Sequence, residues 1–92
     1  MSQSGSTDVV IVDAVRSATA RRNGRLAGVH ATTLLGDVLV GLLERNPIDA
    51  GDVDHVAGGC INQVGMQGNN VTRTSWLAAG LPLEVPASTT SL

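Results

Sequence analysis

The sequence predicts an α/β fold in which a βαβαβ unit forms a mostly parallel sheet. A run of β-branched residues over about 8–14 is apolar on both faces, which is typical of a central parallel strand. Two helical segments follow, over about 31–45 and 69–79, and each precedes another β-prone segment, over about 53–60 and 85–91. Both connections between strands are long enough for right-handed parallel crossovers, so the order of elements favours a parallel sheet.

The chain has room for one small domain. A chain of 92 residues buries only about two-thirds of its unfolded surface when it folds alone. Residues 1–7 are small and polar, and we expect a flexible leader there. Residues 8–92 are expected to form an incomplete domain that opens with the strand over about 8–14. An Arg- and Gly-rich loop follows it, from Arg16 to Gly28.

The first helix, over about 31–45, is predicted by the spacing of its apolar residues. They follow the pattern i, i+3, i+4, i+7, i+8, i+11, i+12 without a gap: Ala31, Leu34, Leu35, Val38, Leu39, Leu42 and Leu43. Asp37 and Glu44 lie off this stripe. Asn46 and Pro47 end the helix, because the residue before a proline avoids the helical conformation.

The second half of the chain predicts a strand, a helix and a last strand. The helix over about 69–79 is opened by Asn69 or Asn70 and closed by Gly80. Because both crossovers step in the same direction, both helices lie on one face of the predicted sheet and the other face is bare. A bare apolar face is rare in a monomer. The chain also ends on the β-prone stretch "VPASTTSL", so we interpret the sequence as the opening part of a larger α/β domain.

Composition and charge limit the expected partners and compartment. The formal net charge is −2, and four of the six basic residues lie in one short loop: Arg16, Arg21, Arg22 and Arg25. This balance does not favour nucleic acid as a partner. No apolar stretch approaches the ~20 residues that cross a bilayer, and the start "MSQSGSTD" has neither the basic region nor the apolar run of a signal peptide. A single cysteine cannot form an internal disulfide, so we expect a soluble cytoplasmic protein.

Isolated reactive side chains do not form a predicted catalytic or metal site. A single cysteine with a histidine could act as nucleophile and base. Cys60, however, lies in a predicted buried strand, where a free cysteine behaves as a small hydrophobe, so packing is the preferred interpretation. His55 and His30 form neither an i, i+4 ligand pair nor a Cys/His cluster, and surface positions are expected for both.

Three other features have a functional and a structural interpretation. The glycines of "GGCINQVGMQG" could hold phosphate at a helix start, but the chain lacks a G-x-G-x-x-G pattern and a P-loop lysine, which disfavours nucleotide binding. The Arg cluster could meet a phosphate-bearing ligand, yet a solvated loop or a subunit contact is the preferred explanation. Trp76 is assigned to the core or to an interface rather than to a stacking platform.

The ordered set of motifs resembles the amino-terminal segment of a thiolase over about residues 8–92. Arg16 follows the first strand, a "DxxxVDHVxxG" step runs from Asp49 to Gly58, Gln67 to Asn70 lead into the second helix, and "AAGLPLEVPA" covers Ala78 to Ala87. The resemblance implies the βαβαβ opening part of the amino-terminal half of a five-layered αβαβα sandwich with a mostly parallel sheet.

The resemblance also implies the chemistry of the parent chain. In thiolases the third strand leads to the nucleophilic cysteine through a "VPAxTVNxxC" pattern, and matching Val85, Pro86, Ala87 and Thr89 to it places that cysteine two residues beyond Leu92. The parent is then expected to transfer acyl groups between coenzyme A thioesters through an acyl-cysteine intermediate. Ser91 replaces the usual Asn, and Ala18 stands near an expected Pro. No catalytic, cofactor-binding or metal-binding residue is assigned to the 92 residues themselves.

The predicted strand order, 3-2-1, leaves residues 85–91 at an edge of the sheet, where unpaired backbone groups invite a partner. The resemblance implies a twofold homodimer or a dimer of dimers, besides the rest of the thiolase chain and an acyl-CoA substrate. The interface is assigned to these residues: Asn69, Arg73, Trp76, Ala87, Ser88, Thr89, Thr90 and Ser91. The alternative is a non-catalytic, thiolase-like interaction module.

Overall fold

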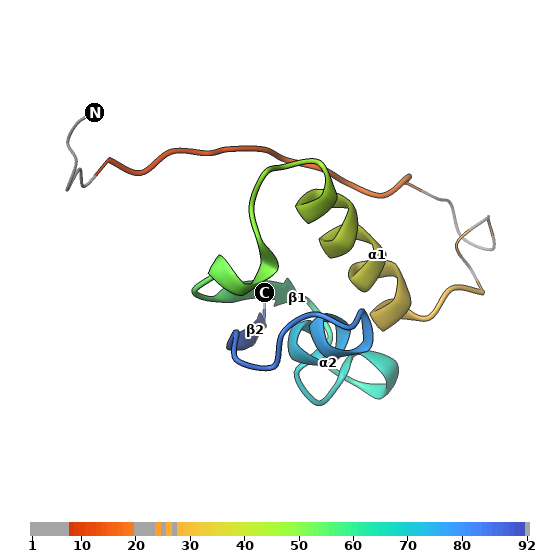
Figure 1. Ribbon diagram of the computed structural model, residues 1–92. Coiled ribbons are helices and arrows are strands. Elements are labelled where there is room, and N and C mark those ends of the chain that lie inside the picture. The colour runs from red at the N-terminus through yellow and green to blue at the C-terminus, as the bar shows by residue number, and fades with distance from the viewer. Residues whose placement is uncertain (1–7, 20–23, 25, 27, 92) are drawn as a thin grey trace.

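The computed structural model describes residues 8–19, 24, 26 and 28–91 and has an α/β fold (Figure 1). Its elements are helix α1 at Ala31–Glu44, strand β1 at Val56–Cys60, helix α2 at Val71–Ala78 and strand β2 at Ala87–Ser91, with 3₁₀ turns at Ala50–Asp52 and Gly65–Gln67. The leader expected at residues 1–7, and Arg21, Arg22 and Arg25 of the Arg cluster, lie outside the described residues.

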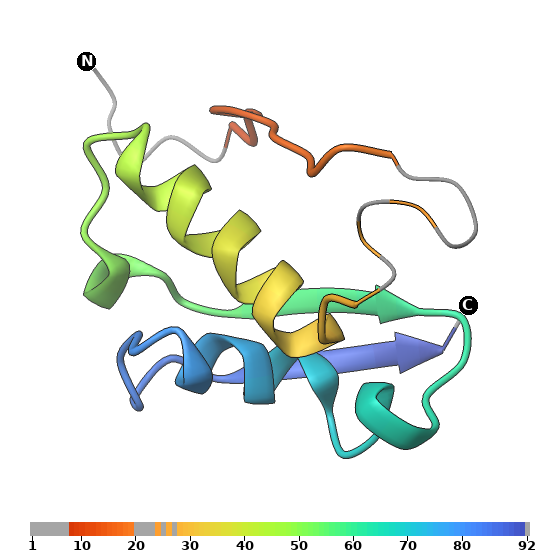
Figure 2. The ribbon, with the colours of Figure 1, turned by 90° about the vertical axis from the view of Figure 1, so that its right-hand side faces the viewer.

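Strands β1 and β2 pair in parallel, as the sequence predicts for these two segments. The register pairs Val56 with Ala87 and Cys60 with Ser91. Helix α2 forms the connection between the strands, and both helices lie on the same face of the sheet (Figure 2). Each strand is shorter than predicted at its start. Residues 53–55, which follow the turn at Ala50–Asp52, join no ladder, and β2 begins only after Pro86, which has no N–H to donate to a ladder.

Helix α1 begins and ends close to its predicted bounds. His30 is its N-cap, with Nδ1 accepting the Thr32 N–H at 3.2 Å, and Arg45 is the C-cap residue rather than the last helical one. The helix packs against α2 around Gly36, which is buried. A Cβ at Gly36 would lie 3.3 Å from the Ser75 carbonyl oxygen, so the two helix backbones approach closely. The predicted apolar stripe of α1 is half-buried.

Helix α2 starts two residues later than predicted. Asn69 and Asn70 both have positive φ, 54° and 56°, a left-handed conformation that cannot belong to a right-handed helix. Asn70 is the N-cap, and its Oδ1 accepts the Arg73 N–H at 3.2 Å. Gly80 ends the helix as predicted, with φ of 80° and an N–H donated to the Leu77 carbonyl, the arrangement of a helix C-terminus closed by glycine.

The core of the described residues is small and centres on α2. Its buried apolar side chains are Val71, Trp76 and Val85, and Thr72 and Ser75 are buried with them. Each buried polar group has a partner. The Ser75 hydroxyl donates to the Val71 carbonyl at 2.7 Å, and Trp76 Nε1 donates to the Pro82 carbonyl at 2.7 Å. Trp76 is therefore a core residue of this chain, one of the two interpretations left open by the sequence.

The strand predicted over about 8–14 is wrong for this structure. The segment is extended but joins no ladder, and its four apolar side chains, Val9 to Val12, are 65–96% exposed. A strand that is apolar on both faces is stabilised by cover on both faces, and in the part of the chain described here both helices lie on one face. The segment runs past α1 instead (Figure 1).

Candidate functional site

The carboxyl ends of β1 and β2 meet at one edge of the sheet and carry a group of polar side chains. We call Cys60, Gln63, Gln67 and Ser91 the carboxyl-edge cluster. Gln63 follows β1 and its Nε2 donates to the Ser91 hydroxyl at 2.7 Å. Gln67, from the 3₁₀ turn before α2, places Oε1 3.6 Å from Cys60 Sγ. In open α/β sheets the carboxyl edge is where ligands bind, so this edge is the candidate functional site.

The carboxyl-edge cluster forms hydrogen bonds but contains no side chain that could act as a base for the Cys60 thiol. Cys60 is half-buried, and its Sγ contacts the Asn62 carbonyl at 3.5 Å and the Gln67 amide oxygen. A carbonyl or amide oxygen accepts a hydrogen bond without taking the proton. An activated cysteine nucleophile needs an adjacent base or a cationic neighbour. The contacts of Cys60 therefore support the structural interpretation of this residue.

The outer edge of β2 presents backbone groups to whatever lies beside it. In a parallel ladder, successive residues of a strand direct their N–H and C=O to opposite edges. Pro86 accepts from the Val56 N–H at 2.9 Å, so it faces β1, and by alternation Ala87, Thr89 and Ser91 face outward. The Ala87 carbonyl already accepts from Asn70 Nδ2 at 3.0 Å. Thr89 and Ser91 are thus the residues whose backbone is best placed for an intermolecular ladder.

The residues of α2 assigned to the interface occupy different environments. Arg73 is half-buried, and its guanidinium donates to the Val85 and Leu83 carbonyls, the latter at 2.9 Å, so it fixes the loop that precedes β2. Trp76 is 1% exposed, and its burial needs no partner chain. Asn69 is exposed beside the start of α2. The interface assignment stays a prediction, and of these three residues Asn69 is the most accessible.

The other assigned interface residues lie on β2, and they divide between its two faces. Ser88 and Thr90 are exposed on the face away from the helices, where the Ser88 hydroxyl lies 3.2 Å from His55 Nε2. Ala87 and Thr89 are half-buried, and the Thr89 hydroxyl donates to Asn70 Oδ1 at 2.7 Å. The exposed face carries small and hydroxyl side chains.

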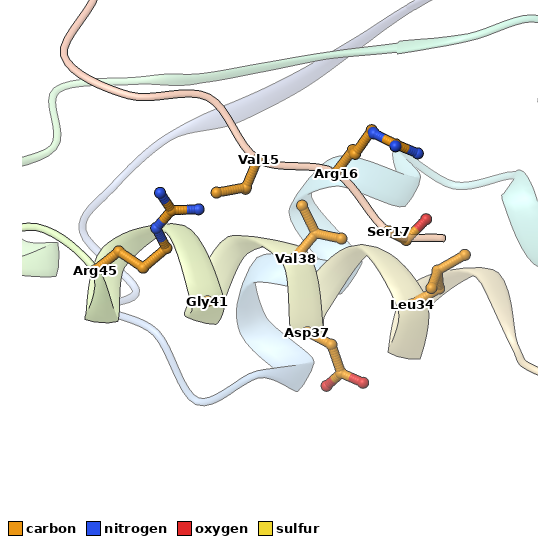
Figure 3. Close-up of a pocket in the computed structure, with 8 residues that line it drawn as sticks. All are labelled: Val15, Arg16, Ser17, Leu34, Asp37, Val38, Gly41 and Arg45. Carbon is orange, nitrogen blue, oxygen red and sulfur yellow. The ribbon is translucent and has the colours of Figure 1, made fainter. Parts of the chain in front are cut away.

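A shallow pocket of about 310 Å³ lies between the extended segment and α1 (Figure 3). Its residues are Val15, Arg16, Ser17, Leu34, Asp37, Val38, Gly41 and Arg45. Val38 points toward the segment, whereas the Arg16 guanidinium points away from the helix and is exposed. Arg16 is thus exposed here, as a solvated loop predicts, and Arg45, the other cation that lines the pocket, contacts Asp13.

Asp13 holds the extended segment at the end of α1. Asn46 Nδ2 donates to Asp13 Oδ2 at 2.9 Å, and Arg45 Nε lies 3.4 Å from the same oxygen. The hydrogen bond from Asn46, then that from the Ala14 N–H, lowers the pKa of Asp13 below the ordinary value for aspartate, and Arg45 adds to this. The ion pair with exposed Arg45 contributes little to stability, and the part-buried hydrogen bond from Asn46 orients the segment.

Two residues that position the site were not identified from the sequence. Gln63 joins β2 from 28 residues away, and a glutamine in a loop gives no local signal of such a contact. Asn70 was noted only as a possible helix start, although its side chain joins α2 to β2 at two points. The tolerance of asparagine for left-handed backbone was the available signal, in the pair Asn69 and Asn70.

The parallel βαβ unit defines an α/β domain. In domains of this class, ligands bind just beyond the carboxyl ends of the strands, where this chain has its polar cluster. Residues 9–91 match the family model described as "Thiolase, N-terminal domain". The chain belongs to the thiolase family, as part of its amino-terminal domain. In the part of the chain that the structure describes, no helix is long and apolar enough to cross a membrane.

Curated relatives support the same family. The chain is 47% identical to a steroid 3-ketoacyl-CoA thiolase of Mycobacterium tuberculosis over 83 residues, which cover 90% of this chain and 20% of the relative. It is 49% identical to a β-ketoadipyl-CoA thiolase of Acinetobacter baylyi over 80 residues, 86% of this chain and 20% of the relative. A 3-ketoacyl-CoA thiolase of Saccharophagus degradans is 46% identical, with 89% of this chain and 22% of the relative covered. The chain spans about a fifth of the length of these relatives.

Proposed function

We propose that these residues form the opening part of a thiolase that transfers acyl groups between coenzyme A thioesters. The observation that carries the proposal is the carboxyl edge of the β1–β2 pair, where β2 ends beside Cys60, Gln63 and Gln67. Relatives named as 3-ketoacyl-CoA thiolases match about nine-tenths of the chain, and the family model spans both strands and both helices. In this proposal the described residues position the reacting segment and do not react themselves.

The proposed reaction divides the work between this unit and the residues after β2. A cysteine two residues beyond Leu92 would attack the keto carbonyl of a 3-ketoacyl-CoA as its thiolate, and cleavage of the carbon–carbon bond would leave the acyl group on sulfur and release acetyl-CoA after protonation. The thiol of free coenzyme A would then take the acyl group. Cys60 has no base among its contacts and stays outside this chemistry.

The first test locates the acyl group. The full-length protein, mixed with a 3-ketoacyl-CoA, is expected to gain one acyl group on the cysteine after Leu92, identified by mass spectrometry of its peptides. The variant Cys60→Ser is the matched control and is expected to react at the wild-type rate. An adduct on Cys60, or no adduct on any cysteine, would contradict the proposal. The second outcome would favour the alternative, a non-catalytic interaction module that uses the outer edge of β2.

We also propose that the protein dimerises through that outer edge and works in the cytoplasm. The dimer proposal is supported by the outward backbone groups of Thr89 and Ser91 and by the small exposed side chains of Ser88 and Thr90. The edge has no lysine to discourage pairing, and the nearest proline, Pro86, precedes the strand. A twofold axis would let β2 of one chain pair with β2 of the second copy. The single cysteine and the sequence composition support the location.

A pair of substitutions at Thr89 tests the edge contact. Thr89→Pro removes the outward N–H and the hydroxyl, whereas Thr89→Val removes the hydroxyl and keeps the N–H. The proline variant of the full-length protein is expected to dissociate about tenfold or more readily than the valine variant, the equivalent of about 1.4 kcal/mol for one lost ladder bond. Sedimentation at several protein concentrations measures the difference. Equal dissociation constants for the two variants would rule the edge out.

A further inference from the structure

The Thr89 hydroxyl joins β2 to the first turn of α2 with all of its hydrogen-bonding capacity. It donates to Asn70 Oδ1 at 2.7 Å and accepts the Thr72 N–H at 3.1 Å. The Thr72 hydroxyl oxygen lies 2.8 Å away, and because the Thr89 proton is already donated to Asn70, the Thr72 hydroxyl is the donor there. We call Asn70, Thr72 and Thr89 the Thr89 network. The network lies where β2 packs against α2. Thr89 follows Thr72 by 17 residues in the chain.

The network supplies caps for α2 from two different parts of the chain. The first N–H groups of a helix have no partner within it. Asn70 Oδ1 accepts the Arg73 N–H, and Thr89, which belongs to the strand, accepts the Thr72 N–H. Asn70 Nδ2 also donates to the Ala87 carbonyl at 3.0 Å. The Thr72 N–H in the first turn of α2 therefore has its acceptor only when β2 lies at one axial position relative to the helix.

The surroundings leave little room for another arrangement. Thr72 is 2% exposed, and a Cβ built on Gly58 of β1 would lie 1.9 Å from its hydroxyl oxygen. A shift of β2 by one residue would turn Thr89 to the open face and bring Ser88 or Thr90 to the helix. Arg73 holds the loop before β2 through the Leu83 and Val85 carbonyls. Both the start and the middle of β2 are thus tied to α2.

From these contacts we infer that Thr89 is a positioning residue: its hydroxyl fixes the axial position of β2 against α2 and thereby places the segment that follows the strand. The inference rests on the proposed function, in which that segment carries the nucleophile. Errors of about 1 Å in the place of a reacting group lower rates up to about 100-fold, so a hydroxyl in the strand can control a reaction that it does not touch.

The test uses three variants of the full-length protein: Thr89→Val, Thr89→Ser and Thr33→Val. The valine at 89 is expected to lower kcat, counted per nucleophilic cysteine titrated by acyl-enzyme formation, by about tenfold while KM changes little. Serine keeps the hydroxyl and is expected to restore most of kcat. Thr33→Val removes a hydroxyl from an exposed position of α1, outside the assigned interface, and is expected to match the wild type. A purely structural role would reduce the number of titrated sites but leave kcat per site unchanged, and that result would overturn the inference.

Hydrogen exchange separates this inference from the proposed function. The Thr72 amide is expected to exchange faster in Thr89→Val than in Thr89→Ser or Thr33→Val, because only the first variant removes its acceptor. If the wild-type protein forms no acyl-enzyme at all, the proposed function fails, and slow exchange of Thr72 that depends on the hydroxyl would still support Thr89 as the residue that fixes β2. Equal exchange in all three variants would overturn the inference whether or not the protein is active.

Discussion

Gly58→Ala, which replaces a single hydrogen by a methyl group, is expected to lower the free energy of unfolding by a large amount. The new Cβ would lie 1.9 Å from the Thr72 hydroxyl oxygen and 3.0 Å from Thr72 Cβ and Cγ2. Thr72 cannot turn aside, because it is buried and hydrogen-bonded to Thr89. Overpacking costs about 1–3 kcal/mol and occasionally more, and loss of the Thr89 network adds to it, so we expect about 3 kcal/mol or more.

The measurement is urea unfolding of the full-length protein, followed by far-UV circular dichroism. Gly41→Ala is the matched control. Gly41 lies in α1, and a Cβ added there would meet no neighbouring atom within 4 Å. Alanine loses less backbone entropy than glycine when the helix forms, so Gly41→Ala is expected to raise the free energy of unfolding by about 0.5–1 kcal/mol. Opposite signs for the two glycines would confirm that close approach, and not loss of backbone freedom, decides the result at Gly58. Equal unfolding midpoints would show that β1 can move away from α2 at no cost.

Trp76→Ala is expected to cost about 3–5 kcal/mol, as large-to-small changes of a buried aromatic do. The side chain is 1% exposed and belongs to a core whose other buried apolar residues, among those described, are Val71 and Val85. A loss of this size is a large part of the stability of about 5–15 kcal/mol that is typical of a domain. Far-UV circular dichroism of the full-length protein under increasing urea measures it.

A second variant separates the packing of Trp76 from its hydrogen bond. Trp76→Phe keeps most of the apolar surface but leaves the Pro82 carbonyl without the Nε1 donor that lies 2.7 Å from it. The expected loss is smaller than for alanine and includes about 1–3 kcal/mol for the unpaired carbonyl. Should the phenylalanine variant prove as unstable as the alanine variant, the hydrogen bond and not the packed ring would be the dominant contribution.

The sequence predicted those elements whose signals are local. The seven-residue apolar stripe of α1, the asparagines before α2 and the glycine after it are each visible in a short window, and both helices form close to the predicted places. The parallel pairing of β1 with β2 followed from the length of the connection. The segment from Val9 to Val12 was predicted as a strand on its β-branched residues alone. β-Branched residues favour a pleated surface that other residues cover. A strand also needs a neighbouring strand to pair with, and the composition of the segment does not specify one.

The candidate site was less predictable, because its contacts join distant residues. The parallel topology alone is enough to predict that the carboxyl ends of β1 and β2 lie at the same edge of the sheet. The contacts of Gln63 with Ser91, and of Thr89 with Thr72, depend on register, and a shift of one residue would exchange the two faces of β2. The sequence motif around Val85 to Thr89 indicated the family but did not indicate that the Thr89 hydroxyl completes a helix cap.

The exposed segment from Val9 to Val12 has a consequence for the behaviour of the chain in solution. Four consecutive exposed β-branched residues without charge or proline have the composition that favours pairing with a strand of another chain, although the run is shorter than the six or seven residues of a typical aggregating window. Asp8 and Asp13 stand directly on either side of it, and flanking charges of this kind act as gatekeepers against stacking of like strands. Asp13 therefore combines two effects, since the carboxylate that meets Asn46 also keeps a negative charge beside the window. Its lowered pKa preserves that charge further into the acid range than an ordinary aspartate would.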